Sequence, residues 1–122
     1  MVIFIVIIIY PPLIVAPKIA PFEFGIEPLN FGEPASVQCT ILGGDLPMNV
    51  TWWHNNESID KFSDIDIAIL NKRINVLSIE SVSGHHAGNY SCQAENIAGL
   101  AMHSALLIVN GLCIIIFILI YP

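Results

Sequence analysis

Apolar and polar residues alternate with a period of two through most of the middle of the chain, the pattern of half-buried β-strands. The alternation predicts strands at residues 36–42, 65–70 and 74–79, and a further strand within the stretch 84–99. The positions expected to point inwards are Val37, Cys39, Ile41, Leu77, Ile79, Gly88, Tyr90 and Cys92. The pattern therefore predicts an all-β domain in which each strand has one buried side.

Prolines and glycines mark the expected bends between strands. Residues 17–22 have prolines suited to an edge strand, and residues 26–30 would continue it. A loop is predicted at 43–47 and a polar turn at 55–58, while Gly99 marks a hairpin bend. The strand that closes the sheet is expected to bury Ala105, Leu107 and Val109.

Two adjacent tryptophans must point to opposite sides of their strand. We assign Trp52 to the core together with Val50 and His54, because Trp52 follows Cys39 at a spacing that suits a core position. Trp53 then lies on the outer side. A shift of one residue would reverse every side chain of this strand.

The order Cys39, Trp52, Tyr90, Cys92 is typical of an immunoglobulin-like, two-sheet Greek-key sandwich. In such a sandwich a tryptophan packs on a disulfide between the two sheets, here between Cys39 and Cys92. Tyr90, two positions before the second cysteine, is expected to be the buried corner tyrosine. A disulfide of this kind belongs to an oxidising compartment.

A wider set of positions carries a family resemblance. Together with the four residues above, the set consists of Leu77, Ile79, Gly88, Ala94, Asn96 and Gly99. It resembles an I-set immunoglobulin domain and, more narrowly, the alternatively spliced seventh immunoglobulin domain of arthropod Down-syndrome cell-adhesion molecules (Dscam). The stretches APKIAPFEF, GEPASVQCTILGGDLP and LSIESV carry the narrower likeness, which covers about residues 16–110.

The resemblance implies a module that binds an identical domain on another cell, beside neighbouring immunoglobulin domains in a larger single-pass receptor. It implies a neuronal cell-surface role such as axon guidance. One departure concerns His86, which stands where the family usually has an aspartate that pairs with a basic residue. The resemblance therefore implies that this salt bridge is missing.

The two ends of the chain differ from the middle. Of its 122 residues, 55% are hydrophobic, and residues 1–15 and 111–122 are almost entirely so. Each apolar end is short for a membrane span, and the first has no basic residue before Lys18. We therefore expect a domain at 16–110 between translated non-coding flanks, with a weak signal-like segment as the alternative for the first. Cys113 falls in the second flank, outside the cysteine pair.

Charge and motifs exclude several function classes. A net charge of −6 with four basic residues does not favour nucleic acid as a partner. No nucleophile elbow is present, so we expect no enzyme, no small-molecule substrate and no cofactor. His85 and His86 are expected to be a solvated loop pair that cannot grip a metal together. Asp64 and Asp66 should share one strand face, without the pattern of a calcium loop.

Surface signals favour an extracellular binding role. Three glycosylation sequons begin at Asn49, Asn56 and Asn89, with Asn56 in a polar turn. The outward positions expected to be apolar are Trp53, Leu106 and Ile108. They favour an association surface or, equally, contact with a neighbouring domain.

The leading hypothesis is homophilic binding through one sheet face or edge, with Asp64 and Asp66 as interface candidates. Long loops of the antibody kind are absent from the sequence, which favours the strands. Two alternatives share the fold. One is a secreted immune-recognition module, and the other is an intracellular, titin-like structural domain, which the sequons and paired cysteines oppose.

Overall fold

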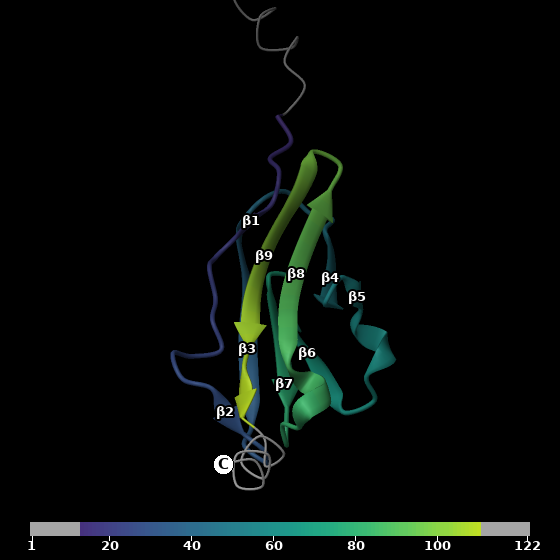
Figure 1. Ribbon diagram of the computed structural model, residues 1–122. Helices are drawn as coiled ribbons and strands as arrows, with labels where there is room; N and C mark the ends of the chain where they lie inside the picture. Colours follow the sequence, from purple (N-terminus) through teal and green to yellow (C-terminus); the bar gives the residue numbers. More distant parts are fainter. Residues whose placement is uncertain (1–12, 111–122) are drawn as a thin grey trace, which may run out of the picture.

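The computed structural model describes residues 13–110 as two antiparallel sheets packed face to face (Figure 1). The first sheet has the order β1-β3-β7-β6, with β1 (Lys18–Ile19), β3 (Ala35–Gly43), β7 (Ile74–Ile79) and β6 (Ile65–Asn71). The second has the order β5-β4-β8-β9, with β5 (Glu57–Ser58), β4 (Asn49–His54), β8 (Gly88–Asn96) and β9 (Gly99–Leu107). The predicted sandwich is confirmed. Cys113 and the flanks at 1–12 and 111–122 lie outside the described residues.

The predicted edge strand is shorter than expected. Within 17–22 only Lys18–Ile19 pairs with a sheet, and within 26–30 only β2 (Leu29–Asn30) does so, in parallel with β10 (Val109–Asn110). The prolines of this segment have no N–H to donate to a ladder. Gly25 adds a bend, because its φ of 129° is rarely open to other residues.

The core lies between the sheets around a disulfide that joins Cys39 on β3 to Cys92 on β8. This confirms the predicted pair. Trp52 is 4% exposed and lies opposite Cys92 in the register of β4 and β8, while Leu77 is fully buried. The ring of Phe22 packs 5.8 Å from that of Trp52. The two sheets are therefore held together at their centre by covalent and aromatic contacts.

Tyr90 fixes the corner between the 3₁₀ turn η2 (Gly84–His86) and β8. Its ring is fully buried, and its hydroxyl donates a 2.6 Å hydrogen bond to the His86 carbonyl. Burial raises the pKa of Tyr90, so the hydroxyl keeps its proton. Gly88 begins β8 at a φ of 138°, and a Cβ there would lie 2.6 Å from Asn55 Oδ1. Only glycine fits this position.

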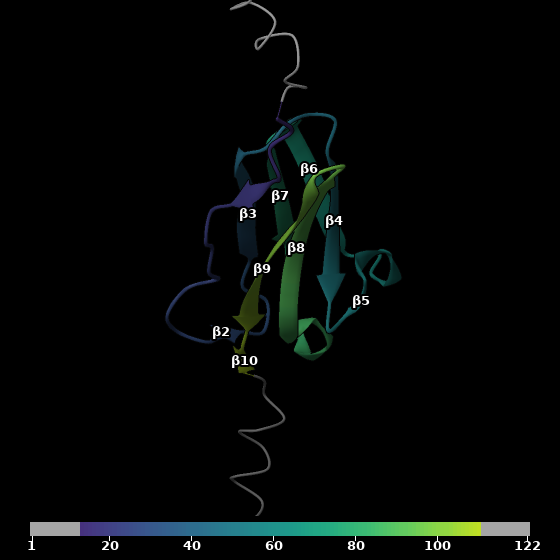
Figure 2. The same cartoon turned by 90° about the horizontal axis from the view of Figure 1, so that it is seen from above.

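The chain enters and leaves the sandwich at opposite ends (Figures 1 and 2). At the entry, the Val15 N–H donates to Asp45 Oδ2 at 2.7 Å, and the Val15 carbonyl accepts from the Asn96 amide at 2.7 Å. Contacts with the sandwich thus begin one residue before the boundary expected at residue 16. Within residues 13–110, no helix has the length and apolar character needed to cross a membrane.

Candidate functional site

The two acidic interface candidates have different surroundings. β6 begins at Ile65, so Asp64 lies just ahead of the strand, and its carboxylate contacts two histidines of η2. Asp66 is exposed on β6 opposite Ser78 of β7. The expectation that both carboxylates occupy one strand face is wrong, because the strand starts only after Asp64. The Asp64 side chain is nevertheless 48% exposed, so both acids remain accessible to a partner.

The expectation of a solvated, divergent histidine pair is also wrong. His85 and His86 lie in η2, where successive side chains turn by about 120° instead of the 180° of a strand. Their rings are 4.0 Å apart, and the Nε2 atoms of His85 and His86 lie 3.1 and 2.9 Å from Asp64 Oδ2. His86 is fully buried. The three residues form one cluster, named here the His–Asp corner.

The His–Asp corner replaces the salt bridge implied to be missing. The resemblance implied an acid before the tyrosine, whereas here His86 occupies that place and Asp64 supplies the acid. The Ser83 N–H donates to His86 Nδ1 at 2.9 Å, so neutral His86 carries its proton on Nε2, beside Asp64. That N–H is not aligned with the carboxylate, and Nε2 is buried without a hydrogen bond. The contact between His86 Nε2 and Asp64 Oδ2 is therefore an electrostatic one at 2.9 Å and not an aligned hydrogen bond.

Burial and charge act in opposite directions on this corner. Burial lowers the pKa of His86 below its usual value, although the Asp64 carboxylate acts to raise it. For Asp64, loss of water acts to raise the pKa, but the hydrogen bond from His85 and the charge of His86 outweigh it and the pKa falls. Near pH 7 the corner therefore consists of a carboxylate beside a neutral, buried imidazole.

Asp64, His85 and His86 also place three potential metal-ligand atoms within 4.8 Å of one another. A histidine that binds metal through Nε2 normally donates its Nδ1–H to an acceptor. His86 Nδ1 instead accepts from the Ser83 N–H. Metal binding at His86 Nε2 would require the tautomer with its proton on Nδ1. The Nδ1–H would then face the Ser83 N–H, and two hydrogen-bond donors would point at each other. The donor set fits a hydrogen-bonded corner better than a metal site.

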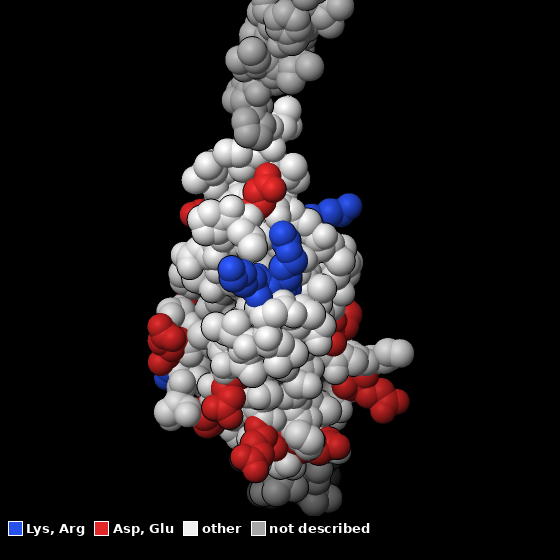
Figure 3. Space-filling model, turned by 180° about the vertical axis from the view of Figure 1, so that it is seen from behind, with Lys and Arg blue, Asp and Glu red and all other residues white. Residues whose placement is uncertain are grey.

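The outer side of the first sheet carries opposite charges at its two ends. We call the outward side of β3, β7 and β6, with the chain just beyond them, the charged face. Asp66 and Glu80 lie at one end, where they line a hollow of about 330 Å³ with Ser36 and Ser78. Lys72 and Arg73 form the β6–β7 turn at the other end. Figure 3 shows this side, with blue side chains in its upper half, red ones below them and at the rim, and a further red group above the blue ones.

Contacts hold the basic end in place. The Arg73 guanidinium donates to the Gly44 carbonyl at 2.9 Å. Lys18 belongs to this end as well, because its strand pairs with β3 at Gly43. The remaining lysine, Lys61, is bound to Glu57 at 2.9 Å on the second sheet. Three of the four basic residues counted in the sequence are therefore gathered at one end of the charged face.

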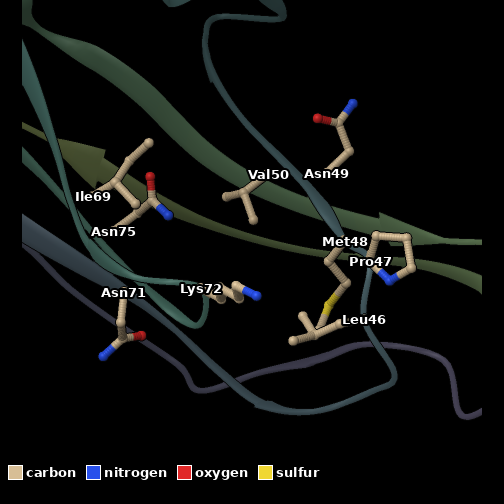
Figure 4. Close-up of a pocket in the computed structure, with 9 residues that line it drawn as sticks. All are labelled: Leu46, Pro47, Met48, Asn49, Val50, Ile69, Asn71, Lys72 and Asn75. Atoms are coloured by element: carbon tan, nitrogen blue, oxygen red, sulfur yellow. The ribbon is translucent and has the colours of Figure 1, made fainter.

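A hollow of about 620 Å³ opens between the edges of the two sheets (Figure 4). Its apolar lining comes from Leu46, Pro47, Met48, Val50 and Ile69, and its polar lining from Asn49, Asn71, Lys72 and Asn75. Asn75 is 6% exposed. The hollow can accept an apolar group of a ligand. Lys72 is part of its lining and could pair with an acidic group of the same ligand.

The outer side of the second sheet is nearly free of charge, and we call it the neutral face. Its outward residues are Asn49, Thr51 and Trp53 on β4, Asn89, Ser91, Gln93 and Glu95 on β8, and Leu100, Met102, Ser104 and Leu106 on β9. Glu95 is the one charged residue in this set. Leu100, Met102 and Leu106 are each more than half exposed, and we call them the β9 row. Trp53 is only half-buried, and Ile108 beyond β9 is 53% exposed.

All three sequon asparagines are exposed. Asn56 lies in the β4–β5 turn with a φ of 65°, whereas Asn49 and Asn89 open onto the neutral face. The sequence pattern could have shown this shared face, since both residues alternate with inward neighbours. It gave no sign of the His–Asp corner, whose members come from separate turns.

The immunoglobulin domain family model matches residues 17–96. Cell adhesion molecule Dscam1 of Drosophila melanogaster is 36% identical over 99 residues, which cover 80% of this chain and 5% of that protein. Cell adhesion molecule DSCAML1 of Mus musculus is 36% identical over 96 residues, 79% of this chain and 4% of that protein. The chain therefore corresponds to a small part of these long relatives.

Solved structures give the same result. A crystal structure of the Dscam1 Ig7 domain, isoform 5, is 41% identical with a TM-score of 0.75, covering 78% of this chain and 97% of that chain. A titin I-band fragment, I67–I69, is 26% identical with a TM-score of 0.72, covering 81% and 34%. The Dscam1 domain is thus more similar to this chain in sequence than the titin fragment is, and it is matched over almost its whole length. The chain belongs to the immunoglobulin domain family, among the immunoglobulin domains of Dscam cell adhesion molecules.

Proposed function

We propose that this chain is an extracellular recognition domain that binds a second copy of itself through the charged face. The observation that carries the proposal is the separation of charge along β6 and β7. Asp66 and the Lys72 turn lie about 20 Å apart at the strand rise of 3.4 Å per residue. Exposed Asp45 lies beside the basic end, but Lys18, Lys72 and Arg73 outnumber it, so this end is net positive. A surface with an acidic end and a net positive end is complementary to its own copy turned around.

A two-fold axis through the middle of the charged face would place each acidic end against the partner's basic end. Each attraction then occurs twice, which doubles the effect of every charge. The outward residues midway between the two ends, Ala68, Val76 and Gln38, carry no charge, so no like charges meet at the axis. Asp66 is part of this surface, whereas Asp64 supports it from the His–Asp corner.

The domain is proposed to act within a row of immunoglobulin domains. The described chain enters at one end of the sandwich and leaves at the other, as a tandem array requires (Figure 1). A solved DSCAM structure with eight N-terminal Ig domains is 36% identical over 80% of this chain. Several weak contacts in one receptor add up to strong adhesion, so a single domain need not bind tightly.

The disulfide favours the cell surface or the extracellular space over the reducing cytosol in which a titin-like domain works. A secreted immune-recognition module would share this fold and these faces. It differs in its partner, because microbial surfaces need not complement the charged face. Binding between copies of the domain distinguishes the two roles.

Bead aggregation with a multi-domain fragment carrying this domain tests the proposal. Beads bearing the wild-type fragment should cluster, and Asp66→Lys should disperse them because each acidic end then meets a basic one. The double variant Asp66→Lys, Lys72→Glu should cluster with itself but not with the wild type. Glu95→Lys on the neutral face is the matched control and should leave clustering unchanged. Clustering of Asp66→Lys as strong as that of the wild type would contradict the proposal.

A further inference from the structure

The neutral face exposes apolar side chains and carries two sequons. The β9 row places Leu100, Met102 and Leu106 at 51%, 52% and 57% exposure along an edge strand. Exposed apolar groups lined up in this way favour contact with another molecule or a covering group. Asn49 and Asn89 are exposed on the same face, so a covering group could be attached to the domain itself.

Asn89 is the better placed of the two acceptors. Its backbone is fixed by Asn55, whose N–H donates to the Asn89 carbonyl at 2.9 Å and whose Oδ1 accepts from the Asn89 N–H at 2.9 Å. Its own side chain forms no hydrogen bond with any residue of the described range 13–110. Directly across the ladder lies Leu106, with Cβ atoms about 5 Å apart. A group attached to Asn89 therefore begins beside the β9 row.

We propose that Asn89 carries an N-linked glycan that lies over the β9 row and covers the neutral face. Met102 is four residues from Leu106 along β9, or about 14 Å, which the core of an N-glycan can span. The apolar faces of sugar rings can pack on Leu106 and Met102, while their hydroxyls meet the side chains of Ser104 and Gln93. The absence of charge on the face, apart from Glu95, suits a neutral saccharide.

Occupancy of the sequon requires that sugar transfer precede folding. In the folded domain the Ser91 hydroxyl of this sequon is 2.6 Å from Ser104 Oγ, and Ser91 is 5% exposed. The glycan must therefore be added before β8 and β9 pair. Once attached, it points outwards with Asn89 and leaves Tyr90 and the core undisturbed.

This inference rests on the extracellular location proposed above but not on self-binding. Its consequence is that the glycan closes the neutral face to protein partners and leaves the charged face open. Asn56 lies at the β4–β5 turn, away from the β9 row. It therefore serves as a control sequon in the same chain.

The test uses the full chain secreted from insect cells behind a cleavable signal, in an Asn49→Gln background that removes the other sequon of this face. Mass spectrometry of tryptic peptides should find glycan on Asn89. Dilute hydrogen peroxide then reports exposure, because accessible methionines become sulfoxides. Met102 should oxidise severalfold more slowly before enzymatic removal of the glycans than after it. Met48 lines the hollow between the sheet edges, away from the β9 row, and its oxidation rate should not change.

Adding Asn89→Gln or Asn89→Ser should give the fast rate without enzyme treatment, whereas Asn56→Gln should keep the slow rate. Two conservative variants at residue 89 guard against a folding defect in one of them. An Asn89 peptide without glycan in secreted protein would overturn the proposal. Equal Met102 oxidation rates with and without the glycan would overturn it as well. Neither outcome depends on bead aggregation.

Discussion

The two outer faces of this sandwich are built on the same scaffold yet present opposite chemistry. The charged face carries an acidic end at Asp66 and a basic end at Lys72, held on neighbouring strands. The neutral face has one charge, Glu95, beside an apolar row and two sequons. Successive side chains of a strand point to opposite sides of its sheet. In both sheets one side packs on the shared core, so the two outer faces lie on opposite sides of the domain and their residues do not mix. The two proposals made above assign recognition to one face of this fold and shielding to the other.

The largest expected effect concerns the link that holds the faces back to back. Replacing both Cys39 and Cys92 by alanine should lower the free energy of unfolding by about 4 kcal/mol, since the disulfide closes a loop with a sequence separation of 53 residues. Urea unfolding of the secreted protein measures this loss. Cys113→Ala is the control and should leave the free energy unchanged. A loss of similar size in the control would show that Cys113 takes part in the pairing.

The second-largest expected effect is that of salt on self-association, which distinguishes binding through the charged face from binding through the neutral face. If self-association uses the charged face, raising salt to about 1 M shortens the screening length to about 3 Å and should weaken binding by about 1–2 kcal/mol. Sedimentation of the multi-domain fragment at low and high salt measures the change. Association through the β9 row would instead persist or strengthen in salt, and that result would assign recognition to the neutral face.

Trimming the chain should have a smaller effect. A domain beginning at Leu13 and ending at Asn110 should unfold cooperatively and be more soluble than the full chain. Starting at Ala16 removes the exposed Val15 hydrogen bonds to Asp45 and Asn96 and should cost about 1 kcal/mol. Thermal unfolding of the two domains gives the difference. Loss of cooperative unfolding in the longer domain would show that the flanks belong to the core.

Acid should produce the smallest change, because burial and the Asp64 charge oppose each other at His86. The pKa of folded His86 is lowered, so its contribution to stability is present above the unfolded pKa near 6.5 and is lost as pH falls towards the folded pKa. Asp64, also lowered, adds a loss at still lower pH, below its unfolded pKa near 3.9. Unfolding midpoints between pH 7.5 and pH 5 should therefore fall.

A polarity-reversed variant provides the control for this pH effect. Combining Asp64→Lys with His86→Asp exchanges the acid and the base of the corner, which places an acid before Tyr90 and a lysine ahead of β6. Neither new group changes charge near pH 6, so the drop between pH 7.5 and pH 5 should shrink. An equal drop in both proteins would assign the pH dependence to other groups and not to His86.

The sandwich, the cysteine pair and the inward side of the main strands could be predicted from the amino-acid sequence alone. These features depend on the local period of two and on the order and spacing of Cys39, Trp52, Tyr90 and Cys92, which can be read along the chain without knowledge of contacts. Edge pairing at 17–30 is less extensive than the sequence predicts, because prolines leave only two short ladders.

How residues of separate turns meet depends on the packing of the folded chain. His85 and His86 converge on Asp64 because η2 rotates successive side chains by less than a strand does, and because the start of β6 lies beside it. The same packing draws Asp64 away from Asp66 and gathers Lys18 with the Lys72 turn. Such contacts join residues far apart in sequence, and no local periodicity encodes them.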